Sequence, residues 1–139
     1  MHKLFIDINV ILDVAAVRHP HHEASQKILT LIENKKAVGY LSAVSCPILY
    51  YLIRKEIGTG KAADFIRDIL RLFIVVEVNR TILEKSLETT AKDFEDGIQM
   101  VCAETCRADY IITRDSSDYK KLAIKALSPA EYLATFPPA

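Results

Sequence analysis

The stretch LFIDINV, residues 4–10, places Asp7 inside a run of large apolar residues. Apolar residues of this kind are typical of a buried β-strand, so we predict a strand over residues 4–8. An ionised carboxylate in apolar surroundings is costly unless it is paired, hydrogen-bonded or bound to a metal. Asp7 therefore needs polar or ionic partners from other parts of the chain, and the rest of the sequence indicates what they are.

Further short segments share this apolar character and are predicted as strands. They span residues 38–43, 73–78, 110–113 and 124–128. Between them, apolar residues recur at helical spacing, which predicts helices over residues 21–35, 45–57, 61–72, 80–89 and 92–106. Strands that alternate with helices predict an α/β fold, a three-layer α/β/α sandwich around a central, mostly parallel sheet of about five strands.

The composition of the chain is typical of a single globular domain. Half of the 139 residues are hydrophobic, which is enough to bury a core, and we expect a single domain over residues 1–139. The 18 Lys and Arg residues balance 18 Asp and Glu residues, so any site for a polyanion has to be a local patch. No signal-peptide pattern and no apolar run of transmembrane length is present, so we expect a cytoplasmic protein without membrane contact.

Acidic residues crowd the start of the last predicted helix, in the stretch KDFEDGIQ at residues 92–99. Asp93 fits a helix N-cap, and acids near a helix N-terminus stabilise it by up to roughly 1 kcal/mol. Helix stabilisation explains one or two of these acids. The spacing puts Asp96 on the same face as Asp93 and Gln99, with Glu95 turned toward solvent. We therefore expect an acidic edge that faces the end of the sheet.

Two more aspartates follow the strand predicted at residues 110–113, in the stretch TRDSSD. Asp118 is explained well by ordinary turn chemistry, whereas Asp115 comes too soon after a buried strand to be turn filler. In parallel sheets, sites form beyond the carboxyl ends of the strands, near the point where the strand order reverses. We expect Asp7, Asp96 and Asp115 to meet there.

Carboxylates gathered at one site repel one another, and a divalent cation relieves this repulsion. Oxygen ligands suit Mg²⁺ or Mn²⁺ better than zinc. A carboxylate-held Mg²⁺ with open water positions orients a water, lowers its pKa and stabilises charge on a phosphoryl group. The acidic residues therefore favour metal-dependent hydrolysis of a phosphodiester, with Asp7, Asp96 and Asp115 as metal ligands and catalytic residues.

The stretches FIDINVILD, DFEDGIQ and IITRDSSDY together resemble the PIN domain family, metal-dependent ribonucleases that include the VapC toxins of bacterial toxin–antitoxin pairs. The resemblance covers nearly the whole chain, including SAVS before the middle helix and the late segment ALSPAEYL. It implies a Mg²⁺- or Mn²⁺-dependent endoribonuclease that hydrolyses RNA, with Asp7, Asp96 and Asp115 at the metal-binding positions of the family. A small antitoxin encoded nearby and a homodimer are the partners that it implies.

The same resemblance implies a set of supporting residues around the metal. Asn9 matches the polar partner beside the first aspartate. Thr113 and Asp118 match positions that often support the site. Asp93 fits a subgroup with the sequence DFED at this helix, where its role is to support the metal ligands.

One position departs from the family pattern. The family usually carries a Glu or Asp on the helix predicted at residues 45–57, and the matching residue here is Ile48. The first acid on this helix, Glu56, lies two turns further on, about 12 Å along the axis at 1.5 Å per residue. The departure predicts a weaker metal site. It keeps open a second function, a PIN-like module that binds RNA or a protein partner without cutting.

A phosphatase of the haloacid dehalogenase type is a third candidate, because it also begins with an aspartate at the end of its first strand. That chemistry needs a second aspartate two residues later, where this chain has Asn9, and this difference argues against a phosphatase. Asp13, on the first helix, is interpreted as a solvated surface acid.

Basic residues flank the acidic motifs despite the neutral total charge. They either contact a phosphate backbone or form a solvated basic face, and the sequence does not separate the two. These residues are Arg54, Lys55, Lys61, Arg114, Lys120 and Lys121.

Overall fold

The computed structural model describes residues 1–119 and 122–138. Its strands form one parallel sheet in the order β3-β2-β1-β4-β5. The strands are β1 His2–Ile6, β2 Ala37–Ser42, β3 Ile74–Val76, β4 Tyr110–Ile112 and β5 Lys125–Leu127. The helices are α1 Ile8–Ala15, α2 His22–Glu33, α3 Ser45–Ile57, α4 Thr59–Leu72, α5 Arg80–Leu87, α6 Phe94–Thr105 and α7 Pro129–Thr135, with a short 3₁₀ helix, η1, at Ser116–Tyr119. None of the described helices is long and apolar enough to cross a membrane.

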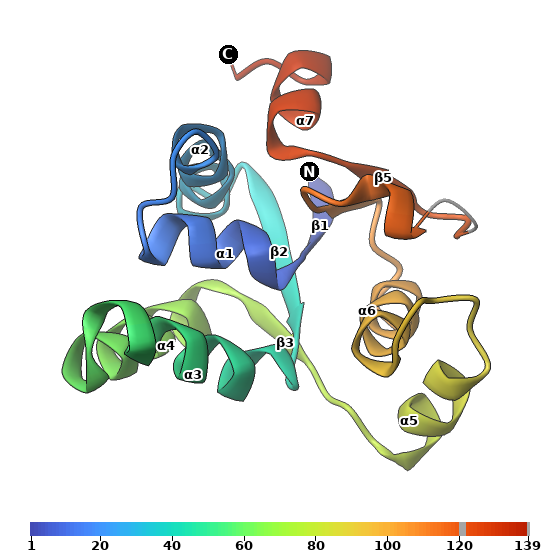
Figure 1. The fold of residues 1–139 in the computed structure, drawn as a ribbon. Coiled ribbons are helices and arrows are strands. Elements are labelled where there is room, and N and C mark those ends of the chain that lie inside the picture. The colour runs from blue at the N-terminus through green and yellow to red at the C-terminus, as the bar shows by residue number, and fades with distance from the viewer. Residues whose placement is uncertain (120–121, 139) are drawn as a thin grey trace.

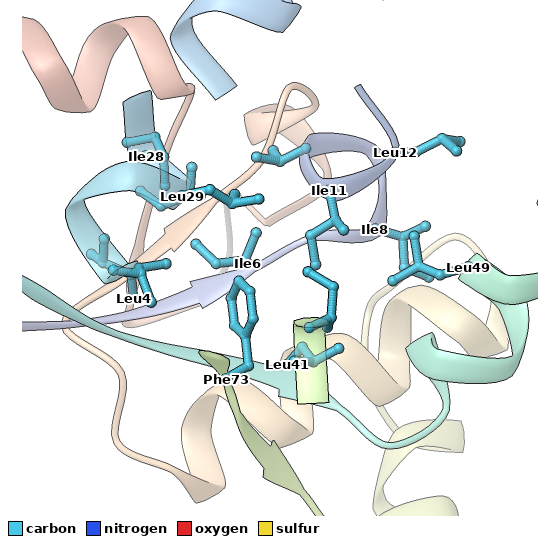
Figure 2. Close-up of a cluster of buried hydrophobic side chains, with 14 of the residues drawn as sticks. Leu4, Ile6, Ile8, Ile11, Leu12, Ile28, Leu29, Leu41, Leu49 and Phe73 are labelled. Atoms are coloured by element: carbon cyan, nitrogen blue, oxygen red, sulfur yellow. The ribbon is translucent and has the colours of Figure 1, made fainter. Parts of the chain in front are cut away.

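Helices cover both faces of the sheet, which confirms the predicted three-layer α/β/α sandwich (Figure 1). Successive residues of β1 point to opposite faces, as they do in any strand. Leu4 and Ile6 belong to the larger apolar cluster with α1, α2, α3, α4 and α7, while Phe5 belongs to the cluster with α5 and α6. Figure 2 shows part of the larger cluster, in which Ile6, Ile11 and Phe73 pack together from three separate segments.

The predicted strands and helices are all present; α3 has the predicted bounds of 45–57, and the other elements differ from the prediction at one or both ends. The sheet is entirely parallel in the described residues, not merely mostly so. Helix α7 was not predicted, although its start carries a complete capping box: the Ser128 hydroxyl accepts from the amide of Glu131, and the Glu131 carboxylate accepts from the amide of Ser128. Pro129 at the first helical position adds a second start signal.

Strand β1 lies at the centre of the sheet and fixes where a site can form. It pairs with β2 on one side and with β4 on the other, so the strand order reverses between β1 and β4. The segments that leave the carboxyl ends of these two strands begin at Asp7 and Thr113. Asp7 and Thr113 are therefore neighbours at the switch point, where parallel sheets place their sites.

The interpretation of Asp13 as a solvated surface acid is wrong. Asp13 is 0% exposed, and its Oδ2 lies 2.8 Å from Nε of Arg114 in the segment after β4. Burial raises the pKa of Asp13, while the positive charges of Arg114, His21 and Arg18 act in the opposite direction. The carboxylate faces inward because a cation from a distant segment meets it there.

Gly97 sets the distance between α6, which begins with the candidate acids, and α5. A Cβ atom at Gly97 would clash with the main-chain carbonyl oxygen of Ser86 and would lie 2.9 Å from Oγ1 of Thr89. Because the first of these is a backbone atom, it cannot rotate away. Only glycine lets α6 pack this closely against the end of α5.

We expect Gly97→Ala to lower the free energy of unfolding by about 1–3 kcal/mol, the usual cost of overpacking. Urea denaturation followed by circular dichroism measures this change. Gly60→Ala is the matched control, because a Cβ at Gly60 meets nothing within 4 Å and alanine favours the helix. Equal stability of the two variants would contradict the close packing of α6 on α5.

Candidate functional site

Asp7 lies outside β1, although the sequence predicts a strand over residues 4–8. Strand β1 stops at Ile6, and Asp7 is the N-cap of α1, with its side chain accepting a hydrogen bond from the amide of Ile8 at 2.8 Å. Its own amide donates to the carbonyl of Ile112 in β4 at 3.0 Å. The residue is half-buried at the end of the sheet, where strand β1 turns directly into helix α1.

Other segments of the chain also donate to the Asp7 carboxylate. Its Oδ1 accepts from Nε2 of Gln99 in α6 at 3.3 Å. Its Oδ2 accepts from the hydroxyl of Thr113 at 2.7 Å and from that of Tyr119 in η1 at 3.3 Å. Each carboxylate oxygen therefore has two donors, counting the Ile8 amide, and these hydrogen bonds offset the cost of keeping the ionised group half-buried.

Asn9 links the first turn of α1 to the segment after β4. Its Nδ2 donates to Oδ2 of Asp115 at 3.2 Å, and its Oδ1 accepts from the amide of Arg114 at 3.4 Å. The amide of Asp115 in turn donates to the hydroxyl of Thr113 at 3.1 Å. Asp115 is thus held beside Asp7 through Asn9 and Thr113, with its carboxylate exposed.

Asp93 and Asp96 occupy the start of α6 as the sequence predicted. Asp93 is the N-cap, and its Oδ1 accepts from the amide of Asp96 at 2.8 Å. Burial, and after it the nearby negative charges of Asp93, Asp118, Asp7 and Glu95, together raise the pKa of Asp96 to about 6. Asp96 is therefore within electrostatic reach of the other acids at this end of the sheet.

Asp118 joins the same acidic group from η1. Its amide donates to the carbonyl of Asp115 at 3.0 Å, and its carboxylate lies 3.7 Å from Nζ of Lys92. Glu95 is exposed, as expected from its position on α6. Although the residue as a whole is exposed, partial burial of its carboxyl group and the negative charges of Asp93 and Asp7 raise the pKa of Glu95. The charge of Glu95 therefore interacts with the other acids at this end of the sheet.

Tyr119 was missed by the sequence analysis. Its ring is buried, and its hydroxyl donates to Asp7. Burial raises the pKa of Tyr119 above its usual range, helped by the charges of Asp7, Asp96 and Asp118 and by the hydrogen bond to Asp7. The hydroxyl therefore stays protonated and remains a donor. No local pattern in TRDSSDY distinguishes this tyrosine from an ordinary core residue.

Gln99 is the other missed partner of Asp7, although its position on the Asp96 face of α6 was predicted. Its carboxamide is buried and bridges two segments. The Nε2 donates to Asp7, and the Oε1 accepts from the hydroxyl of Ser45 at the start of α3 at 3.5 Å. Ile48, one turn further along α3, is half-buried and packs against the larger apolar cluster.

The basic residues that flank the acidic motifs in the sequence have different surroundings in the structure. Arg54 and Lys55 are exposed near the end of α3, with their cationic groups over the Tyr51 ring. Lys61 is exposed in α4, and Arg114 is paired with Asp13. Lys120 and Lys121 lie outside the described residues.

The oxygen atoms at this end of the sheet are the kind that Mg²⁺ and Mn²⁺ prefer. In residues 1–119 and 122–138, no three His, Cys, Asp or Glu side chains converge into a ready group for a metal ion. Burial is the largest cause of the raised pKa of Asp96, and the repulsion by Asp93, Asp118, Asp7 and Glu95 that adds to it is the part that a bound cation would relieve. The donor chemistry and the electrostatics therefore fit a divalent cation whose remaining ligands are waters and substrate oxygens.

Known proteins with similar sequences and structures place the chain in a family. The PIN domain model matches residues 3–117. Ribonuclease VapC1 from Aquifex aeolicus (strain VF5) is 27% identical over 135 residues, or 94% of this chain and 92% of that protein. A toxin–antitoxin complex from Klebsiella pneumoniae has a chain with a TM-score of 0.68 at 19% identity, covering 91% of this chain and 97% of that one.

A further solved structure has the same fold. It is the sarcin-ricin loop cleaving toxin VapC20 of Mycobacterium tuberculosis, with a TM-score of 0.64 at 14% identity over 78% of this chain and 86% of that one. The similarity of the solved structures concerns the fold alone. Because the family model spans most of the sequence, from β1 through the candidate acids to η1, the chain belongs to the PIN domain family.

Proposed function

We propose that the chain is a Mg²⁺- or Mn²⁺-dependent endoribonuclease that hydrolyses phosphodiester bonds of RNA. The observation that carries this proposal is the Asp7 carboxylate, which accepts hydrogen bonds from α1, α6, η1 and the segment after β4 at the switch point of the sheet. Membership of the PIN domain family and the similarity to a protein named ribonuclease VapC1 support the same activity.

Asp7, Asp96 and Asp115 would hold the metal ion. When bound, such an ion lowers the pKa of a coordinated water and stabilises negative charge on a phosphoryl group. Thr113, Tyr119 and Gln99 fix the orientation of the Asp7 carboxylate. Because its two oxygens already accept four hydrogen bonds, a cation bound to Asp7 would replace at least one of these donors. Asn9 orients Asp115 in the same way.

Asp93 and Asp118 act on Asp96 through their charge. Burial is the largest cause of the raised pKa of Asp96, and the charges of Asp93 and Asp118 add to it, so that the pKa of this carboxyl is about 6 in the metal-free protein. At neutral pH the ionised Asp96 is available to a cation, and its affinity for positive charge is increased by these two neighbours.

A second candidate function is a PIN-like module that binds RNA or a protein partner without cutting. Ile48 motivates it, because the resemblance puts an acid at this position in the family. The half-buried Ile48 side chain packs on apolar neighbours and offers no oxygen to a metal. Measurable RNA binding without Mg²⁺ or Mn²⁺ binding in calorimetry would favour this module over the nuclease.

The biological setting that we propose is the toxin of a toxin–antitoxin pair. The support is the similarity to a chain from a toxin–antitoxin complex of Klebsiella pneumoniae. The proposed partners are an RNA substrate, a small antitoxin protein and a second copy of the chain as a homodimer, and the proposed location is the cytoplasm.

Asp7→Asn should reduce metal-dependent RNA cleavage by about 100-fold or more, because it removes the charge that holds the cation while keeping the side-chain shape. Cleavage of a labelled RNA in the presence of Mg²⁺ measures the effect. Asp64→Asn is the control, since Asp64 is an exposed residue of α4 paired with Arg67. Full activity of Asp7→Asn would exclude the proposed chemistry.

Tyr119→Phe should weaken Mn²⁺ binding and cleavage by roughly 10- to 100-fold, the usual effect of removing a hydrogen bond that orients a metal ligand. The phenylalanine keeps the ring in the core. Isothermal titration with Mn²⁺ reports affinity separately from activity. Tyr40→Phe, on the half-buried Tyr40 of β2, is the matched control. Unchanged Mn²⁺ affinity would remove Tyr119 from the site.

The stability of the metal-free protein should depend on pH through Asp96. The folded pKa of about 6 lies above the usual value of 3.8, so between these values the folded state binds more protons than the unfolded state. Stability contributed by this group is therefore present at low pH and is lost as the pH rises toward 6. Urea denaturation in EDTA at several pH values should show a smaller loss for Asp96→Asn than for the wild type. Parallel pH profiles of the two proteins would show that Asp96 titrates normally.

A further inference from the structure

Arg114 lies between Thr113 and Asp115, so its position is fixed by the same segment that carries the candidate acids. Its amide donates to Asn9, and its Nε lies 2.8 Å from Oδ2 of the buried Asp13. The guanidinium is held through Nε, and its side chain remains 28% exposed. Arginine can bridge two anions because its donors form a rigid fork, which a lysine ammonium does not provide.

A cavity of about 260 Å³ opens beside this guanidinium, between the start of α2 and the start of α7. It is several times larger than the roughly 30 Å³ that a water molecule occupies in the liquid. Its lining residues are Pro20, His21, Ala24, Ser25, Arg114, Ser128, Pro129 and Ala130.

Ser25 indicates that this cavity takes a polar ligand. The residue is 0% exposed and lines the cavity, and within the described part of the chain its hydroxyl has no hydrogen-bond partner. A buried hydroxyl without a partner is costly and is uncommon in folded proteins. A ligand with acceptor oxygens would satisfy Ser25 and Arg114 together.

We propose that Arg114 and Ser25 bind a backbone phosphate of single-stranded RNA that neighbours the phosphate to be cleaved. This inference rests on the proposed nuclease function. Because Arg114 lies between Thr113 and Asp115 in the chain, an RNA strand with one phosphate at Asp7 and Asp115 would bring an adjoining phosphate toward Arg114. Asp13 would position Arg114 for this contact through the ion pair between its Oδ2 and Nε of Arg114.

The salt dependence of RNA binding tests the contact, because each phosphate contact with single-stranded nucleic acid contributes about 0.7 to the slope of log K against log salt. Fluorescence anisotropy with a labelled single-stranded RNA is measured in Ca²⁺, with a gel to verify that the RNA stays intact. The variants are the double substitution Asp13→Asn with Arg114→Gln, which avoids an unpaired buried charge, and Arg114→Lys, which keeps a cation beside Asp13. Arg67→Gln, on the exposed surface of α4, is the control.

Both Arg114 variants should lower the slope by about 0.7 and weaken binding about tenfold or more at low salt, while Arg67→Gln changes neither. If a folded Arg114 variant shows the same slope of log K against log salt as the wild type, the inference is overturned. The proposed nuclease function is then retained if the variant still cleaves RNA. If the variant keeps the wild-type salt dependence of RNA binding but binds an acidic protein partner more weakly, the inference is overturned and Arg114 belongs to a protein interface instead. Failure of the wild-type chain to bind or cleave single-stranded RNA overturns the inference and the proposed function together.

Discussion

The hydrogen bonds to the Asp7 carboxylate hold the candidate site together. They come from the first turn of α1, from the middle of α6, from the segment after β4 and from η1. Helix α6 lies on the opposite face of the sheet from α1, so this carboxylate connects the two outer layers at the end of the sheet. The orientation of α6, and with it the position of Asp96, depends on that connection.

The same end of the sheet gathers more negative charge than hydrogen bonds alone can accommodate. Asp7 is surrounded by donors, whereas Asp96 is partly buried and has acids as its neighbours, and burial and these charges together raise its pKa. The two carboxylates illustrate two solutions to one problem, because hydrogen bonding favours the ionised form and like charge disfavours it. A divalent cation at this end of the sheet would offset the repulsion between these acids.

Much of this arrangement can be read from the sequence. The β-branched runs and the helical spacing identify the strands and helices, because each element buries one regular pattern of side chains. The end of β1 was misplaced by two residues because LFIDI continues the apolar run into α1, and only the cap role of Asp7 marks the boundary. The burial of Asp13 and the contact of Tyr119 could not be read, because their partners lie 101 and 112 positions away along the chain. Helix α7 could have been found from its capping box.

The central position of β1 also determines when the site can exist. Strand β1 precedes the other described strands in the sequence, and Asn9 and Asp115, which contact each other across the switch point, are 106 positions apart. Pairing of β1 with β4 closes a loop that includes most of the molecule, and contacts of such long range form slowly and late. An N-terminal fragment that ends before β4 has Asp7 but lacks Thr113, Asp115 and Tyr119. The hydrogen-bonded surroundings of Asp7 therefore exist only in a chain long enough to include Thr113, Asp115 and Tyr119.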